Sequence, residues 1–174
     1  VGILFVLAGH LVGLLTPEFI YHHVISTPNK QLLAMVSGGL FGALCFIGLT
    51  MLIVRRFTDP RVRASSNFSD LLVLVLLYIQ LILGLSTIYA SSQHMDGSVM
   101  VMLANWAQLL VILQPMEAAA SIAPVSLVYK LHVFLGMTLF LIFPFTRLVH
   151  IISGLAAPVK YLLRNYQIVR RKRA

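Results

Sequence analysis

Residues 126–152 read SLVYKLHVFLGMTLFLIFPFTRLVHII, and this segment decides the class of fold. It is apolar along most of its length. An α-helix rises ~1.5 Å per residue, so a segment of this length would form a helix of ~40 Å, whereas the hydrocarbon layer of a bilayer is ~30 Å thick. The sequence therefore predicts a membrane-spanning helix here.

Two histidines lie near the ends of this segment. His132 and His150 are 18 residues apart, which corresponds to about five turns of a helix, so both would lie on one face, ~27 Å apart along the axis. Ionisable groups inside a membrane helix are costly and are commonly functional. One such histidine could simply hydrogen-bond a neighbouring helix; two at this spacing favour a functional site.

The composition agrees with a membrane protein. Of 174 residues, 59% are hydrophobic and only 10% are charged, whereas soluble domains carry about 25% charged residues. We expect an all-α integral membrane protein, a bundle of transmembrane helices that forms a single membrane domain over residues 1–174. The only cysteine, Cys45, lies in an apolar run. Because the chain has a single cysteine, an internal disulfide and a cysteine-based metal site are excluded.

The hydropathy pattern predicts four spans and one short interfacial helix. The spans are expected at residues 1–15, 30–54, 71–89 and 126–152, and the interfacial helix within residues 99–113, around Trp106. Residues 114–124 are expected to form a loop, and Pro144 to kink the last span. The first run would reach only ~22 Å. With no initiator Met before it, we expect this helix to begin upstream of Val1.

The net charge of +8 arises from 13 Lys and Arg against 5 Asp and Glu. In a membrane protein such an excess marks cytoplasmic loops and is no sign of a nucleic-acid partner. Eleven of the basic residues fall in residues 55–63 or 147–173, which leaves Lys30 and Lys130 on the other side. We therefore expect a multi-pass membrane protein with a cytoplasmic C-terminus; the family resemblance described below implies the inner (cytoplasmic) membrane of a prokaryote.

This topology places His10 and His132 at similar depth. Each would lie about six residues, or ~9 Å, inside the outer end of its helix. Two imidazoles from facing helices, with no thiolate or carboxylate at that depth, suit the axial ligation of a b-type haem. Zinc would need further ligands, and a proton relay would need acidic residues within the spans. Small residues would let the haem plane approach the helices: Gly9, Gly13 and Gly136.

Other polar residues allow two interpretations each. His150 would lie at a deeper haem level, where no partner histidine is present in the chain. Arg147 could contact a haem propionate or anchor the inner interface. Lys30 could hydrogen-bond a quinone carbonyl or extend its ammonium group to water. For His22 and His23, the simpler interpretation is solvated loop side chains, and His94 also lies in an outward loop.

Several motifs closely resemble one known family. These are LAGHLVGLLTP (7–17), PRVRASS (60–66), SSQHMDGS (91–98), WAQ (106–108) and KLHVFLGMTLFLIFPFTRLVHI (130–151). They are similar to the gamma subunit of the membrane-bound respiratory nitrate reductase, a di-haem cytochrome b. The likeness covers essentially the whole chain.

The resemblance implies a five-span protein that anchors a cytoplasmic dimer of an iron–sulfur beta subunit and a molybdenum-containing alpha subunit, and oxidises membrane quinol near the outer face. Carried over by residue, His10 and His132 match the ligands of the outer haem, and His150 matches one ligand of the inner haem. Lys30 and Gly9 match positions of the quinol site. The family's first span, with the second inner-haem histidine, is expected before Val1, so we expect one haem b in this chain and two in the family.

We therefore expect an electron-transfer subunit of a quinol:nitrate oxidoreductase in anaerobic nitrate respiration, with nitrate reduced on a partner subunit. Two alternatives belong to other classes. A haem-free membrane anchor would only dock soluble subunits through its basic loop and tail. A transporter is disfavoured, because transporters generally need polar midplane residues and broken helices.

Overall fold

The computed structural model describes residues 1–146 and residue 149. Within that part the chain is helical and contains no strand. In order, the elements are α1 (Gly2–Leu15), α2 (Glu18–Tyr21), α3 (Thr27–Thr58), α4 (Pro60–Ala64), α5 (Phe68–Ser92), α6 (Ser98–Val111), α7 (Pro115–Ile122), α8 (Leu127–Ile142) and the 3₁₀ turn η1 (Phe143–Phe145).

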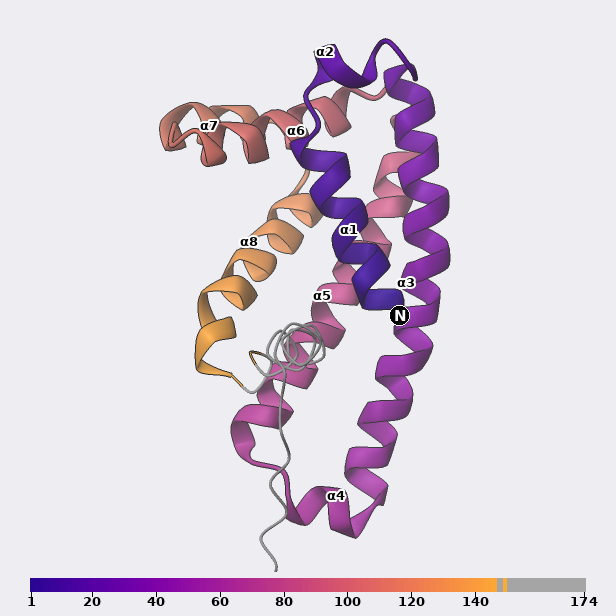
Figure 1. Ribbon diagram of the computed structural model, residues 1–174, viewed down its shortest axis with the longest axis vertical. Coiled ribbons are helices and arrows are strands. Elements are labelled where there is room, and N and C mark those ends of the chain that lie inside the picture. The colour runs from indigo at the N-terminus through magenta and orange to yellow at the C-terminus, as the bar shows by residue number, and fades with distance from the viewer. Residues whose placement is uncertain (147–148, 150–174) are drawn as a thin grey trace, which may run out of the picture.

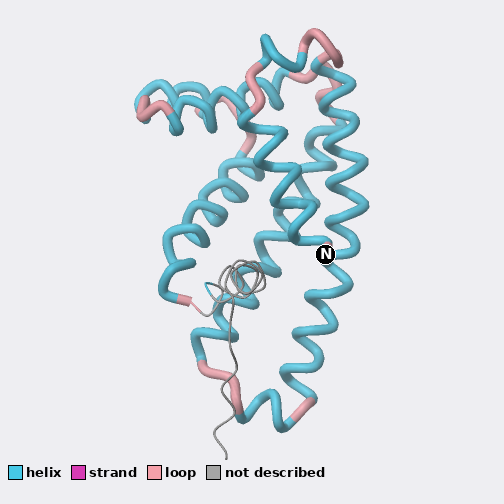
Figure 2. Tube along the Cα trace, viewed as in Figure 1, coloured by secondary structure: helices cyan, strands magenta, loops and turns pink. Residues whose placement is uncertain are grey.

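Two long helices, α3 and α5, form the frame of the bundle. They run in opposite directions and are joined at one end by α4 (Figure 1). Helix α1 packs on α3, and α8 packs on α5. Helices α6 and α7 lie across the other end, and Figure 2 shows that the loops gather mainly at the two ends of the bundle. We call α3 and α5 the central pair. The helix that carries His10 thus packs on one member of this pair, and the helix that carries His132 packs on the other.

Local sequence signals explain where several helices begin. Asn67 and Asp70 form a capping box at the start of α5, which satisfies backbone N–H groups that would otherwise be unpaired. The Asp59 side chain accepts a hydrogen bond from the Arg61 N–H at the start of α4, and Pro60 occupies the first helical position there, where no N–H is needed.

Small residues let the helices approach closely. At Gly42 of α3, an added Cβ atom would lie 2.8 Å from the Leu85 side chain of α5. At Gly2 of α1, it would lie 3.0 Å from backbone atoms of Phe41 and Cys45. Small residues at helix contacts are typical of membrane bundles. Many large apolar side chains on the outer surface are exposed, as expected for helices surrounded by lipid.

Three described segments are long and apolar enough to cross a membrane. They are Thr27–Thr58, Phe68–Ser92 and Leu127–Phe145. Helix α1 has 14 residues, about 21 Å of helix, which is shorter than the hydrocarbon layer. The structure thus supports a membrane bundle with three candidate spans, and the count of four stays a prediction.

Two sequence-based expectations are wrong. Residues 114–124 were expected to be a loop, but they contain α7, with Pro115 in its first turn. The last span was expected to be one helix over residues 126–152. Instead α8 ends at Ile142, a 3₁₀ turn with Pro144 follows, and Thr146 has extended backbone angles. Proline lacks the N–H that continues a helix, in agreement with the end of α8 just before Pro144. His150, the second histidine of this segment, lies outside the described residues.

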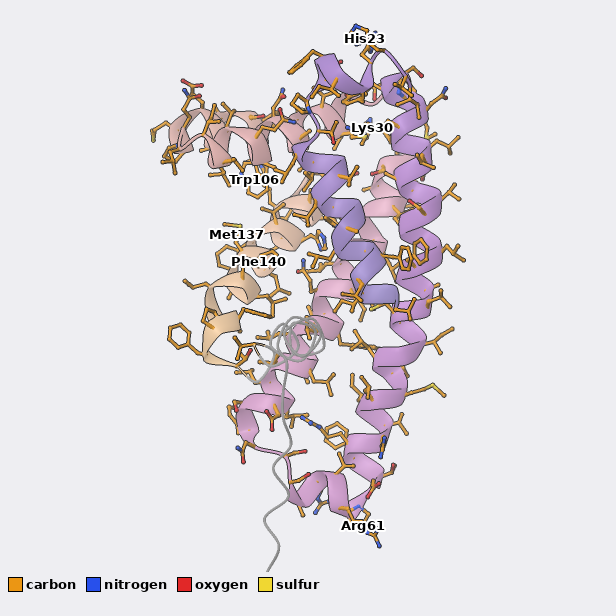
Figure 3. The ribbon with its side chains drawn as sticks, in the orientation of Figure 1. His23, Lys30, Arg61, Trp106, Met137 and Phe140 are labelled. Carbon is orange, nitrogen blue, oxygen red and sulfur yellow. The ribbon has the colours of Figure 1, made fainter. Side chains whose placement is uncertain are left out.

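The described basic residues separate along the bundle. Arg61 lies at the end formed by α4, whereas Lys30 and His23 lie at the opposite end (Figure 3). Arg63 lies with Arg61 in α4, and Arg55 and Arg56 occupy the last turn of α3. The described part of the chain is therefore arranged as the charge asymmetry predicts, with one end rich in arginine.

Candidate functional site

The structure brings His10 of α1 and His132 of α8 together. The centroids of their imidazole rings are 6.0 Å apart, and the ring planes are inclined by 42°. His10 is exposed, and His132 is half-buried against α5. This is the juxtaposition that the depth argument predicts for two helices running in opposite directions.

This spacing suits two ligands of one metal ion. A bond from an imidazole nitrogen to a metal is about 2 Å long, and the ring centroid lies ~1.2 Å behind that nitrogen, so two rings on opposite sides of one metal have centroids roughly 6 Å apart. The 6.0 Å between His10 and His132 matches that value. The pair therefore has the spacing that axial ligation of one haem iron requires.

The hydrogen bond of His10 prepares it to bind a metal. Its Nδ1 lies 2.7 Å from the carbonyl oxygen of Val6, one turn earlier in α1. Because a carbonyl only accepts, Nδ1 carries the proton and donates it, and Nε2 keeps its lone pair. Metal-binding histidines are commonly fixed in this way. His23 makes the same bond with Phe19, so the bond supports the assignment only together with the position opposite His132.

Helix α5 surrounds the other imidazole. A Cβ atom at Gly84 would lie 3.0 Å from Cε1 of His132, so only a glycine leaves room for the ring there. Gln80, one turn earlier, donates from Nε2 to the carbonyl oxygen of His132 at 3.1 Å. The position of this ring is therefore set by α5 as much as by its own helix.

Glycines next to His10 leave open space. A Cβ atom at Gly9 or Gly13 would have no neighbour within 4 Å, which fits a flat macrocycle lying along α1. The same role was expected for Gly136, but there the Cβ position is 3.0 Å from Nε2 of Gln80. Gly136 therefore accommodates Gln80, and that expectation is wrong.

The residues around this pair fit a haem better than a metal held by protein ligands alone. Within residues 1–146 and 149, no group of three or more His, Cys, Asp or Glu side chains is close enough to hold a metal ion. A zinc site needs three or four such ligands, whereas a haem supplies four nitrogens itself and takes two from the protein. Two imidazoles at the right spacing, beside open space, meet that need.

Lys30 lies in the first turn of α3, at the end of the bundle opposite Arg61 (Figure 3). Its side chain is buried, with 9% of its surface exposed, and Nζ lies 3.5 Å from the centroid of the Tyr21 ring, a cation–π contact. Among the described residues Nζ has no hydrogen-bond partner. A lysine that extends to water would leave its ammonium group exposed, so this burial favours a bound ligand with an acceptor oxygen.

Comparison with known proteins shows the family of this chain. The family model described as "Nitrate reductase gamma subunit" matches residues 1–172. The chain belongs to the nitrate reductase gamma subunit family. It is 48% identical to the respiratory nitrate reductase 1 gamma chain of Escherichia coli strain K12, over 98% of this chain and 74% of that one.

Other members of the gamma subunit family are also similar. The respiratory nitrate reductase 2 gamma chain of the same strain is 47% identical over 99% of this chain and 75% of its own length. The nitrate reductase gamma chain of Bacillus subtilis strain 168 is 33% identical over 98% of this chain and 75% of its own. Members of this family belong to an oxidoreductase complex, and this chain is consistent with a membrane electron-transfer subunit.

The structure describes only some of the other site residues that were predicted for this gamma-type subunit. Arg147 and His150 lie outside the described residues. Gly9 adjoins His10 on α1, and Lys30 lies in the first turn of α3, at the end of the bundle opposite Arg61. Sequence reasoning missed Gln80 and Gly84. They lie four residues apart in an apolar run and therefore share one face of the helix. A polar residue and a glycine on the same face of a span are the sequence feature that could have indicated a helix contact here.

Proposed function

We propose that this chain is a membrane cytochrome b that oxidises quinol near the outer face of the membrane. It passes the electrons through b-type haem to an iron–sulfur beta subunit and a molybdenum-containing alpha subunit in the cytoplasm, where nitrate is reduced. The observation that carries the proposal is the 6.0 Å spacing of the His10 and His132 rings, in a chain of the nitrate reductase gamma subunit family.

His10 and His132 would hold the outer haem as its two axial ligands. When bound, the haem supplies one-electron redox chemistry, which the side chains of the protein cannot provide. The helices bring the two ring centroids to 6.0 Å from each other, and the bond from His10 to the Val6 carbonyl fixes one tautomer of His10. His150 is proposed as a ligand of an inner haem and Arg147 as a propionate contact, by their match to the family.

Lys30 is proposed to bind the quinol headgroup. Its buried ammonium group lacks a hydrogen-bond acceptor in the described part of the chain, and a quinol or quinone oxygen would supply one. Gly9, next to His10, leaves room for a headgroup close to the haem ligand. Oxidation of a quinol to a quinone releases two electrons and two protons, and Lys30 lies at the end opposite Arg61.

The charge asymmetry supports an outward release of protons. Arginine-rich ends face the cytoplasm, so a quinol site at the lysine end would face outward. Electrons would move inward toward the cytoplasmic subunits. Opposite movement of protons and electrons separates charge across the membrane, and turnover would contribute to the membrane potential.

A dithionite-reduced minus oxidised optical spectrum of the protein purified from membranes, with a haem-to-protein ratio, tests the proposal. Sharp b-type bands at one or more haems per chain are the expected result. Absence of these bands, even after reconstitution with haem, would contradict it. That outcome would leave the alternative of a haem-free anchor for soluble subunits, in which the His10 and His132 pair has only a structural role.

A further inference from the structure

Gln80 of α5 is inserted against the turn of α8 that carries His132. Its Nε2 atom donates to the His132 carbonyl oxygen at 3.1 Å. The same nitrogen lies 3.0 Å from the position that a Cβ atom would take at Gly136, one turn further along α8. The carboxamide therefore reaches the backbone of α8 because residue 136 has no side chain.

Two polar atoms at the contact between Gln80 and α8 lack a hydrogen-bond partner among the described residues. Nδ1 of His132 and Oε1 of Gln80 are both buried, and neither has a hydrogen-bond partner in the described part of the chain. A buried polar atom without a partner is costly. If Nε2 of His132 binds a metal, the ring is neutral and its proton is on Nδ1, which must donate. Oε1 can only accept, so the two unpaired atoms are complementary.

The partner histidine is already satisfied. Nδ1 of His10 donates to the Val6 carbonyl of its own helix, whereas the structure shows no such bond for His132. The last side-chain torsion of glutamine is broad and costs little to turn. The carboxamide that already bonds the backbone of His132 also carries the acceptor Oε1. Turning it would exchange the bond from Nε2 to the His132 carbonyl for one from the ring to Oε1.

Resting on the haem ligation proposed above, we propose that Gln80 is a positioning residue of the His132 ligand. Its Oε1 accepts the Nδ1–H of the imidazole and thereby sets the tautomer, the orientation and the basicity of the ring. Gly84 lies close to the ring and limits its freedom. Such partners of metal-bound histidines typically alter metal affinity by 10–100-fold when removed.

Two substitutions separate this role from simple packing. Gln80→Leu removes both the donor and the acceptor. Gln80→Glu keeps an acceptor oxygen but has no donor for the His132 carbonyl when it is ionised, whereas its protonated form can donate through O–H. It is therefore measured over a range of pH that includes the ionised form. The acceptor role predicts that Gln80→Leu is defective and Gln80→Glu is rescued. A role limited to the amide donor predicts that both fail alike.

The variants are measured in the holoprotein purified with its partner subunits in nanodiscs. The readouts are haem content, the midpoint potential of the outer haem and the electron paramagnetic resonance spectrum of its ferric form. For Gln80→Leu we expect haem retention about 10-fold weaker or worse and a higher midpoint potential, because a less basic imidazole stabilises ferric iron less. For Gln80→Glu we expect wild-type retention and a potential at or below that of the wild type.

Gln108→Leu is the matched control. Gln108 also donates from Nε2 to a backbone carbonyl of another helix, that of Leu14 at 3.0 Å, but it does not contact His132. The Gln108→Leu variant should keep the wild-type midpoint potential of the outer haem and the wild-type electron paramagnetic resonance spectrum. Equal shifts in both Gln80 variants, or wild-type values in both, would overturn the acceptor role. Absence of b-type bands in the wild-type protein would overturn the haem proposal itself, and this inference with it.

Discussion

The imidazole rings of His10 and His132 lie 6.0 Å apart although they stand on helices held by different members of the central pair. α3 supports the helix of His10, and α5 supports the helix of His132. The distance between the rings therefore depends on how α3 and α5 pack. A substitution at the contact between these two helices should change the distance between the two imidazoles.

Replacing either histidine should remove one haem signal. We expect His10→Ala and His132→Ala each to lose the b-type bands of the outer haem, because one axial ligand remains where two are needed. The reduced-minus-oxidised spectrum of the purified complex measures this loss. His23→Ala is the control, since Nδ1 of His23 makes the same type of bond, to the Phe19 carbonyl, but His23 lies in the turn after α2. Unchanged bands in the first two variants would contradict the ligand assignment.

Lys30→Met should impair quinol oxidation without harming the fold. The substitution removes a buried ammonium group that has no hydrogen-bond partner among the described residues, so thermal stability should hold or rise. A hydrogen bond from a charged group is worth about 1.5–3 kcal/mol, and kcat/KM for quinol should therefore fall roughly 10- to 100-fold. Steady-state kinetics with a quinol analogue give the result.

Lys130→Met is the matched control for the quinol prediction. Lys130 also lies at the outer end of a helix, but its Nζ donates to the Ala123 carbonyl oxygen at 2.7 Å. Its kcat/KM for quinol should stay near that of the wild type. Similar kinetics in the Lys30 and Lys130 variants would argue against a quinol contact at Lys30.

Gly84→Ala should disturb the His132 ring. The new methyl group would lie 3.0 Å from Cε1 of the imidazole, which is closer than ordinary van der Waals contact. We expect a shifted ferric haem spectrum in electron paramagnetic resonance, or partial haem loss. Gly48→Ala is the comparison, because no atom lies within 4 Å of its Cβ position; it should leave the spectrum unchanged. A normal spectrum in the Gly84 variant would mean that the ring is not confined there.

Tyr129→Phe should lower stability. The Tyr129 hydroxyl is 2.7 Å from the Ser91 hydroxyl and 3.3 Å from the Thr87 carbonyl oxygen, and the side chain is buried. Loss of these bonds should cost about 0.5–1.5 kcal/mol, measured as a lower midpoint of thermal unfolding in detergent. Combined with Ser91→Ala, the loss should be less than the sum of the two single losses, because both substitutions remove the same contact. Strict additivity would show that the two hydroxyl groups are not coupled.

Much of the bundle was predictable because hydropathy and helix geometry are local properties. The long apolar runs predicted α3 and α5, and the run after Ser98 predicted a helix too short to span. The rise per residue also predicted that His10 and His132 would lie at one depth. Nothing local predicted the end of α8 at Ile142, because a proline inside a membrane helix can kink the helix or end it, depending on its surroundings.

The sequence by itself determined a helical membrane protein and its charge asymmetry, and it predicted that the two candidate ligands lie at one depth. Only the tertiary structure decided which side chains meet those ligands. Gln80 and Gly84 contact His132 because α5 is turned to present them to α8. The rotation and tilt of a membrane helix depend on packing against its neighbours rather than on its own apolar length, so this part of the site follows from the fold alone.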